Sequence, residues 1–149
     1  MIKVAIDSNV LFSAFVNQGA VARKLLVLAG EQRIYLGVPK YCLLELEPVF
    51  RDKLGQDWDR RYRQLQDWVD TYAEEIIYPR GKMLNRYKDY VVGDVFDVPV
   101  IASAIEWGAE YFVTGNFKDY RKEKVELHLK MISVRQFLNI FQAEEGADY

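Results

Sequence analysis

The sequence predicts an α/β fold in which helices cover both faces of a central, mainly parallel sheet of about five strands. Short apolar runs rich in β-branched residues alternate along the chain with longer stretches whose apolar residues recur at helical spacing. Because parallel neighbours must be joined by crossover connections, this alternation favours a parallel sheet. We therefore expect a three-layer α/β/α sandwich, built by the 149 residues as a single domain.

The first half of the chain shows the alternation from its start. The β-branched run over residues 2–6 is typical of a buried strand. Ser8 or Asn9 is suited to cap a following helix over residues 10–15. In order, we then expect a helix within residues 19–30, a strand over 33–39, a helix over 40–50 with a kink or break at Pro48, and an amphipathic helix over 58–72.

The second half repeats the pattern. Residues 81–93 are polar and irregular, which predicts a surface loop with a partial helix. An apolar stripe at helical spacing predicts a helix over residues 98–105 that ends at Gly108. The other expected elements are strands over 74–79, 110–115 and 129–133, and a final helix over 134–141 before an acidic tail at 142–149.

Composition narrows the possible chemistry. The net charge of -2 excludes binding to nucleic acid through bulk positive charge, although local basic patches are still possible. Cys42 is the single cysteine, so no internal disulfide can form, and a reducing compartment is expected. The single histidine, His128, argues against a zinc site or a histidine triad. Lys3 and Asp7 interrupt the N-terminal apolar run, so we expect a soluble, cytoplasmic protein without a membrane segment.

Acidic and amide side chains stand at the ends of the predicted elements. Asp7 follows the first strand and Asn116 follows the fourth, and the carboxyl ends of parallel strands share one edge of the sheet. Carboxylates gathered without basic partners repel one another, and a divalent cation removes that cost. The sequence therefore predicts a site for Mg²⁺ or Mn²⁺, ions suited to phosphoryl chemistry. The candidate ligands are Asp7, Glu45, Asp94, Asp97, Asn116 and Asp119.

Each of these residues also has a purely structural interpretation. Asp7 is suited to cap the helix that follows it. Asp97 is suited to be an N-cap with a proline in the first helical turn. Asn116 lies in a sequence, TGN, that is common in turns. The order of these residues along the chain carries more weight than any one of them.

That order resembles the PIN-domain family of metal-dependent ribonucleases, many of which are toxins of toxin–antitoxin pairs. The segment VAIDSNVLFSAF resembles the family's opening strand and helix, and LLELEPVFRDKL resembles the helix with its second acid. GDVFDVPVIASAIEWGAEYFVTGN resembles its third motif and fourth strand, and the likeness spans residues 2–141. The resemblance implies a PIN-like fold and an endoribonuclease of a type II pair. It also implies RNA and a cognate antitoxin as partners, and a homodimer of the kind common in the family. We expect the RNA to be single-stranded, because a single strand passes a cleft most easily and aromatic rings can stack on its bases.

The resemblance also assigns roles to individual residues. It places the catalytic acids on Asp7, Glu45 and Asp97, and Asn116 stands where many members carry a fourth acid. Asp94 and Asp119 are then further metal ligands, and hydrogen bonds from Ser8, Asn9 and Thr114 are expected to orient carboxylates or water. Candidate contacts to RNA phosphates are Arg51, Lys53, Arg80, Lys82 and Arg86.

Two alternatives remain open at this point. Asn116 adds no charge, so the chain can also be a weak or inactive PIN-like module that binds RNA or a partner protein. The segments DSNVL and GDVFD also resemble the first and last acidic motifs of haloacid-dehalogenase-like phosphatases. That mechanism needs an acid two residues after its nucleophilic Asp, and Asn9 stands at this position.

Overall fold

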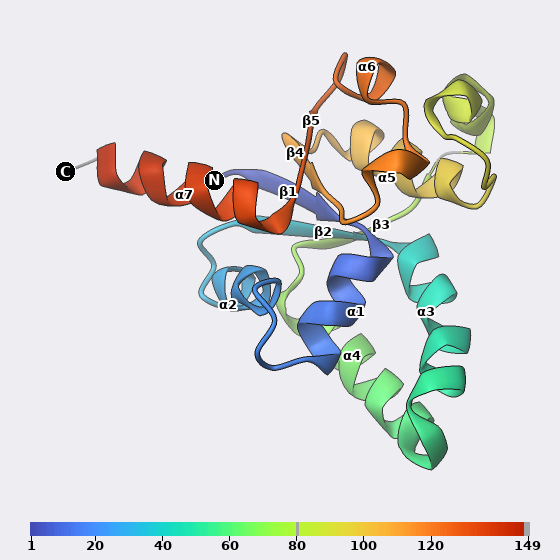
Figure 1. Ribbon diagram of the computed structural model, residues 1–149, viewed down its shortest axis with the longest axis vertical. Coiled ribbons are helices and arrows are strands. Elements are labelled where there is room, and N and C mark those ends of the chain that lie inside the picture. Colours follow the sequence, from blue (N-terminus) through green and yellow to red (C-terminus); the bar gives the residue numbers. More distant parts are fainter. Residues whose placement is uncertain (80, 148–149) are drawn as a thin grey trace.

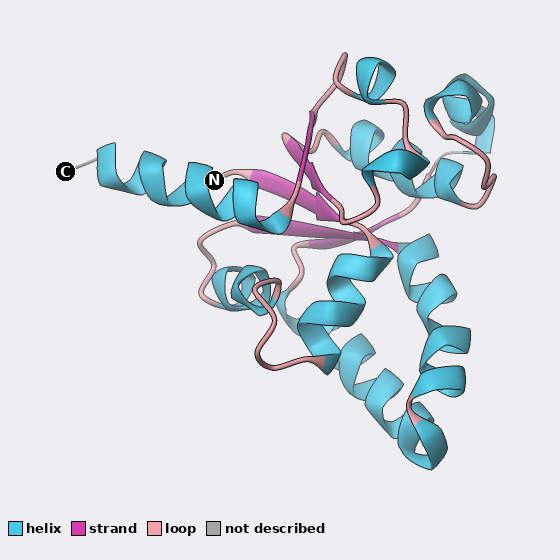
Figure 2. Cartoon of the chain, viewed as in Figure 1, coloured by secondary structure: helices cyan, strands magenta, loops and turns pink. Residues whose placement is uncertain are grey.

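The structure is a computed structural model that describes residues 1–79 and 81–147, with the backbone alone for residues 82, 83 and 144–147. Within these residues the chain forms one five-stranded sheet with helices on both faces, which confirms the expected three-layer fold (Figures 1 and 2). The strands are β1 (Lys3–Ile6), β2 (Tyr35–Pro39), β3 (Glu75–Ile77), β4 (Tyr111–Val113) and β5 (Lys130–Ile132). The helices are α1 (Ser8–Val16), α2 (Arg23–Gly30), α3 (Lys40–Lys53), α4 (Trp58–Tyr72), α5 (Asp97–Trp107), α6 (Lys122–Val125) and α7 (Val134–Ala147), with short 3-10 segments η1 (Gly55–Asp57), η2 (Gly81–Tyr90) and η3 (Phe117–Asp119).

The sheet has the strand order β3-β2-β1-β4-β5, and every pair of neighbours is parallel. The chain first builds outward from β1 to β2 and β3, then crosses back to place β4 and β5 on the other side of β1. The order therefore reverses between β1 and β4. In open parallel sheets, such a switch point opens a crevice at the carboxyl ends of the two strands.

Alternation of side chains along the strands divides the core between the two faces. Val4 and Ile6 pack with α1, α2, α3, α4 and α7, whereas Ala5 between them packs with α5, α6 and η2. Figure 1 shows the first group of helices below the sheet, with α7 at the left, and the second group above it. Both faces of the central strands are buried, as the short apolar runs in the sequence indicate.

Several element boundaries differ from the expectations. Asp7, and not Ser8 or Asn9, is the N-cap of α1. Helix α3 continues past Pro48 to Lys53, so a break at the proline is wrong, and the second helix begins only at Arg23. The segment expected as an acidic tail is helical as far as Ala147. The expected end of α5 at Gly108 is confirmed, where the backbone is left-handed with a φ of 85°.

No helix in the described residues is both long and apolar enough to cross a lipid bilayer.

Candidate active site

Asp7 lies at the carboxyl end of β1, and its side chain is almost completely buried, with 4% of the residue exposed. Its Oδ1 accepts a hydrogen bond from the backbone N–H of Ser8 at 2.8 Å. Its Oδ2 accepts two more, from the Thr114 hydroxyl at 2.8 Å and from the Tyr120 hydroxyl at 3.0 Å. Burial raises the pKa of Asp7 although these hydrogen bonds oppose the rise. Asp7 therefore caps a helix and is also held in a fixed orientation from two further elements.

The second acid, Glu45, is tied to the same place through Ser8. The Ser8 hydroxyl donates to Glu45 Oε2 at 3.0 Å, so the first turn of α1 contacts the second turn of α3. Burial raises the pKa of Glu45, and the negative charges of Asp7 and Asp94 add to the rise. Ser8 therefore links two of the expected metal ligands, one through its N–H and one through its hydroxyl.

Asp97, the third expected acid, is the first residue of α5 and does not cap the helix, because the N-cap position belongs to Phe96. Its carboxylate is half-buried. Burial raises the pKa of Asp97 to about 7, and the negative charges of Asp7, Glu45, Asp94 and Asp119 contribute to the rise. The structure thus brings these five acids, from four segments of the chain, into mutual repulsion at one edge of the sheet.

Within the described residues, no lysine or arginine forms an ion pair with any of these five acids. Their oxygen atoms are the donors that hard divalent cations prefer. As the side chains stand in the described part of the chain, however, no three acidic, histidine or cysteine side chains form a set that could hold one metal ion. The donor chemistry and uncompensated charge fit a divalent cation, although a complete three-residue ligand set is not formed.

The remaining expected site residues surround this centre. Asp94 is exposed and its Oδ1 accepts from the backbone N–H of Phe96 at 2.9 Å. Asn116 is exposed, and its backbone N–H donates to the Thr114 hydroxyl at 3.0 Å. Asn9 lies in the first turn of α1, where its Oδ1 accepts from the Gly115 N–H at 3.2 Å. Asn9 and Thr114 therefore connect the start of α1 to the loop after β4.

Sequence reasoning did not find Tyr120. Only 4% of this residue is exposed, its ring packs edge-on against Phe112 at 5.3 Å between centroids, and its backbone pairs with Val91. Burial, and after it the negative charge of Asp7, raises the pKa of Tyr120, so its hydroxyl stays protonated and donates to the carboxylate. The only signal in the sequence was an aromatic residue one position after Asp119, which does not indicate a partner at residue 7.

The basic residues expected to contact RNA are scattered. Arg51 pairs with Glu47 at 3.3 Å and lies over the Trp58 ring, and Lys53 lies over the Phe12 ring. Both are at the far end of α3, which points away from the sheet (Figure 1). Arg86 is exposed on η2. Arg80 lies outside the described residues, as does the side chain of Lys82.

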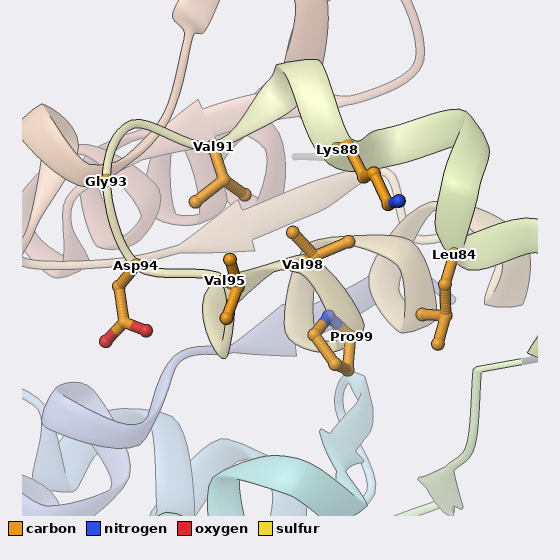
Figure 3. Close-up of a pocket in the computed structure, with 8 residues that line it drawn as sticks. All are labelled: Leu84, Lys88, Val91, Gly93, Asp94, Val95, Val98 and Pro99. Carbon is orange, nitrogen blue, oxygen red and sulfur yellow. The ribbon is translucent and has the colours of Figure 1, made fainter.

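An apolar cavity of about 390 Å³ adjoins the acids between η2 and the first turn of α5. Figure 3 shows Asp94 at one end of this cavity and Lys88 at the other, with the valine and proline side chains between them. Val95 and Phe96, at the start of α5, are 72% and 64% exposed. An unusual amount of apolar surface therefore lies beside the acidic centre.

A family model of the PIN domain matches residues 3–118. The chain belongs to the PIN-domain family. The haloacid-dehalogenase-like interpretation therefore has no further support, and the PIN domain accounts for both acidic motifs on which it was based.

Solved structures share this PIN fold at low sequence identity. VapBC2 from Rickettsia felis, bound to a DNA fragment from the promoter, has a TM-score of 0.62 and 16% identity over 87% of this chain and 97% of that one. DNA-bound VapBC from Salmonella typhimurium has a TM-score of 0.62 and 18% identity over 90% and 99%. FitAB bound to an IR36 DNA fragment has a TM-score of 0.61 and 11% identity over 88% and 94%. No curated protein sequence matches the chain.

Proposed function

We propose that this PIN domain is a metal-dependent endoribonuclease that acts as the toxin of a type II toxin–antitoxin pair. The observation that carries the proposal is the group of five acids around the buried Asp7, at the crevice where the strand order reverses, which has no basic partner among the described residues. Such a group is costly in an isolated protein, and a bound cation would repay the cost. The membership in the PIN family supports hydrolysis of RNA as the reaction that uses it.

In this proposal Asp7, Glu45 and Asp97 hold Mg²⁺ or Mn²⁺, and Asp94, Asn116 and Asp119 assist through water. Because the described side chains do not form a three-residue set, one or two of these carboxylates would bind the ion directly, and water molecules and a substrate phosphate would complete the coordination, as is usual for Mg²⁺. Such an ion, when bound, activates water for attack on a phosphodiester and stabilises charge on the leaving oxygen.

The protein's own residues prepare this site before any ion or substrate arrives. Thr114 and Tyr120 fix the direction of the Asp7 carboxylate, and Ser8 fixes that of Glu45. Hydrogen bonds of this kind orient the side chains that bind a metal ion. The apolar cavity beside Asp94 offers a surface for the face of an unstacked base, which favours single-stranded RNA over a duplex.

Partners and location follow by analogy with the structural neighbours. VapBC and FitAB are solved as complexes, which supports a cognate antitoxin for this chain as well, and a homodimer remains part of the proposal. The apolar residues left exposed at the start of α5 are suited to such contacts. The buried free thiol of Cys42 is consistent with the cytoplasm as the proposed location.

The experiment that tests the activity compares Glu45→Gln with Glu47→Gln. The two acids lie two residues apart on α3, but the side chain of Glu47 is 44% exposed and pairs with Arg51, whereas Glu45 lies with the other acids. With labelled single-stranded RNA and Mn²⁺, we expect Glu45→Gln and Asp7→Asn to lower the cleavage rate by at least about 100-fold. Glu47→Gln should cleave at the wild-type rate, and EDTA should stop cleavage by the wild type and by Glu47→Gln. Equal rates in all three variants would disprove the proposed site.

The absence of a three-residue ligand set among the described residues, together with Asn116 in place of an acid, favours one second candidate, a PIN-like binding module without activity. Calorimetric titration with Mn²⁺ separates the two candidates. Binding that is lost in Asp7→Asn supports the nuclease. A wild-type protein that binds RNA but neither binds Mn²⁺ nor cleaves would establish the module.

A further inference from the structure

A groove of about 500 Å³, lined by both polar and apolar residues, lies between α1, the loop after β4 and the start of α7. It is formed by elements from the face of the sheet opposite to that of η2 and α5, which line the apolar cavity. The groove is continuous with the acidic centre, because Thr114 lines it and also donates to Asp7. Asn9, two residues after Asp7, lines it as well.

The groove is positively charged although it lies next to five acids. None of the residues that line it is an aspartate or glutamate, and Arg135 is its one charged side chain. Arg135 is exposed at the second position of α7, and no carboxylate within the described residues pairs with it. The charge of the guanidinium is therefore not neutralised by the described protein.

Backbone donors add to this charge. The Ser133 hydroxyl accepts from the N–H of Gln136, and the side-chain oxygen of Gln136 accepts from the N–H of Ser133, which satisfies two of the four free donors at the start of α7. The N–H groups of Val134 and Arg135, which line the groove, have no acceptor in the described part of the chain. Helix α7 runs from Val134 to Ala147, long enough for its dipole to favour an anion at this end.

An independent observation also indicates a missing acceptor. The amide nitrogen of Asn9 is buried and has no hydrogen-bond partner among the described residues, while its amide oxygen already accepts from Gly115. A buried donor without an acceptor is costly, and such donors are uncommon in folded proteins. The groove therefore combines an arginine with two free backbone donors, and one of the residues in its wall carries a buried side-chain amide without an acceptor. Donors of this kind suit an anion with several oxygens.

We propose that this groove binds a phosphate of the substrate RNA that neighbours the phosphate at the acids. The inference rests on the proposed function for the presence of RNA, and it adds where the strand runs. The RNA backbone leaves the acidic centre over Thr114 and Gly115 towards the start of α7. Arg135, and not the scattered residues of α3, then provides the main charged contact.

The test measures binding of a fluorescent single-stranded RNA by anisotropy in EDTA, so that no cleavage occurs. Arg135→Gln removes the proposed contact. Arg63→Gln is the matched control, because it makes the same chemical change on α4, where the side chain is 70% exposed and pairs with Asp59. We expect Arg135→Gln to weaken binding about 3- to 10-fold and to reduce the slope of log K against log salt by about 0.7. Arg63→Gln should leave both quantities unchanged.

A second arm separates RNA from free phosphate. Titration with inorganic phosphate, followed by amide NMR, reports whether Gly115, Val134 and Arg135 respond to the anion alone. A response to phosphate with RNA binding that is insensitive to Arg135→Gln makes the groove a site for a free anion and overturns the inference. The inference is also overturned if the wild type and Arg135→Gln bind RNA equally and phosphate causes no response.

Cleavage in Mn²⁺ is scored separately, so the two proposals can fail independently. If RNA is bound through Arg135 but never cleaved, the groove is supported and the nuclease is not. If the wild type and Arg135→Gln cleave RNA equally at limiting substrate, the nuclease is supported and the groove is not.

Discussion

Replacement of Asp97 by Asn tests whether the acids of this PIN domain repel one another in the absence of metal. Burial and four neighbouring negative charges raise the pKa of Asp97 from 3.8 to about 7. In the folded protein the charged form is therefore disfavoured relative to the unfolded chain. Between these two pH values the native state binds the extra proton, so its stability falls as the pH rises towards about 7 and stays reduced above it. Asp97→Asn removes this loss.

The size of the effect follows from three contributions. A change from 3.8 to about 7 would correspond to about 4 kcal/mol in a fully dry site. Asp97 is only half-buried, so solvent screens the repulsion and about 1–2 kcal/mol is the realistic range. The carboxylate also lies in the first turn of α5, and Asn forfeits about 0.5 kcal/mol of favourable interaction with the helix dipole. We expect a net stabilisation of about 1 kcal/mol.

The assay is urea denaturation in EDTA, measured at about pH 8 and about pH 4, with Asp89→Asn as the control. Asp89 is an exposed acid of η2 that forms an ion pair with Lys124, outside the acidic centre. Asp97→Asn should be more stable than the wild type by about 1 kcal/mol at the higher pH and equal to it at the lower pH. An equal or smaller stability of Asp97→Asn at the higher pH would refute the mutual repulsion, and with it the need for a cation.

Three further outcomes are expected. Tyr120→Phe keeps the ring but removes a hydrogen bond to the Asp7 carboxylate, so calorimetry should show Mn²⁺ binding about 10-fold weaker, with about 1–2 kcal/mol lost in urea denaturation. Mn²⁺ at about 100 times its dissociation constant should stabilise the wild type by about 2.7 kcal/mol in the same denaturation assay, and Asp7→Asn should not respond. Val95→Asp places a charge at the apolar cavity beside Asp94, so steady-state kinetics should show a KM for single-stranded RNA raised several-fold with kcat little changed.

The strands and most of the helices could be predicted because their signals are local. A buried parallel strand reads as a short β-branched run, and an amphipathic helix reads as a stripe, wherever either lies in the chain. The end of α7 was missed for a related reason. Residues 142–147 were interpreted as a tail because of their charge, although alanine, glutamate and glutamine are good helix formers. Gln142 and Ala143 are exposed, and an acidic composition does not distinguish an exposed helix from a coil.

The candidate site could also be predicted only in part. The position of Asp7 and Asn116 directly after strands placed both at one edge of any parallel sheet, whatever the strand order. The order itself decides which side chains meet, because β4 pairs with β1 and so brings Thr114 and Tyr120 to Asp7 across more than 100 residues of sequence. No local sequence pattern predicts those hydroxyl contacts.

Arg135 is a further residue whose role could not be predicted from the sequence. In the sequence it is one of twenty basic residues and stands at the start of a helix, where a solvated side chain is the ordinary expectation. Its proposed role comes from three facts that only the folded chain supplies: the groove, the free N–H groups beside it and the unsatisfied amide of Asn9. In the proposed function the acids hold a cation and this groove holds a phosphate, and Thr114 belongs to both sites. The two proposed sites therefore lie side by side at the β1–β4 switch point, where one RNA strand can contact both.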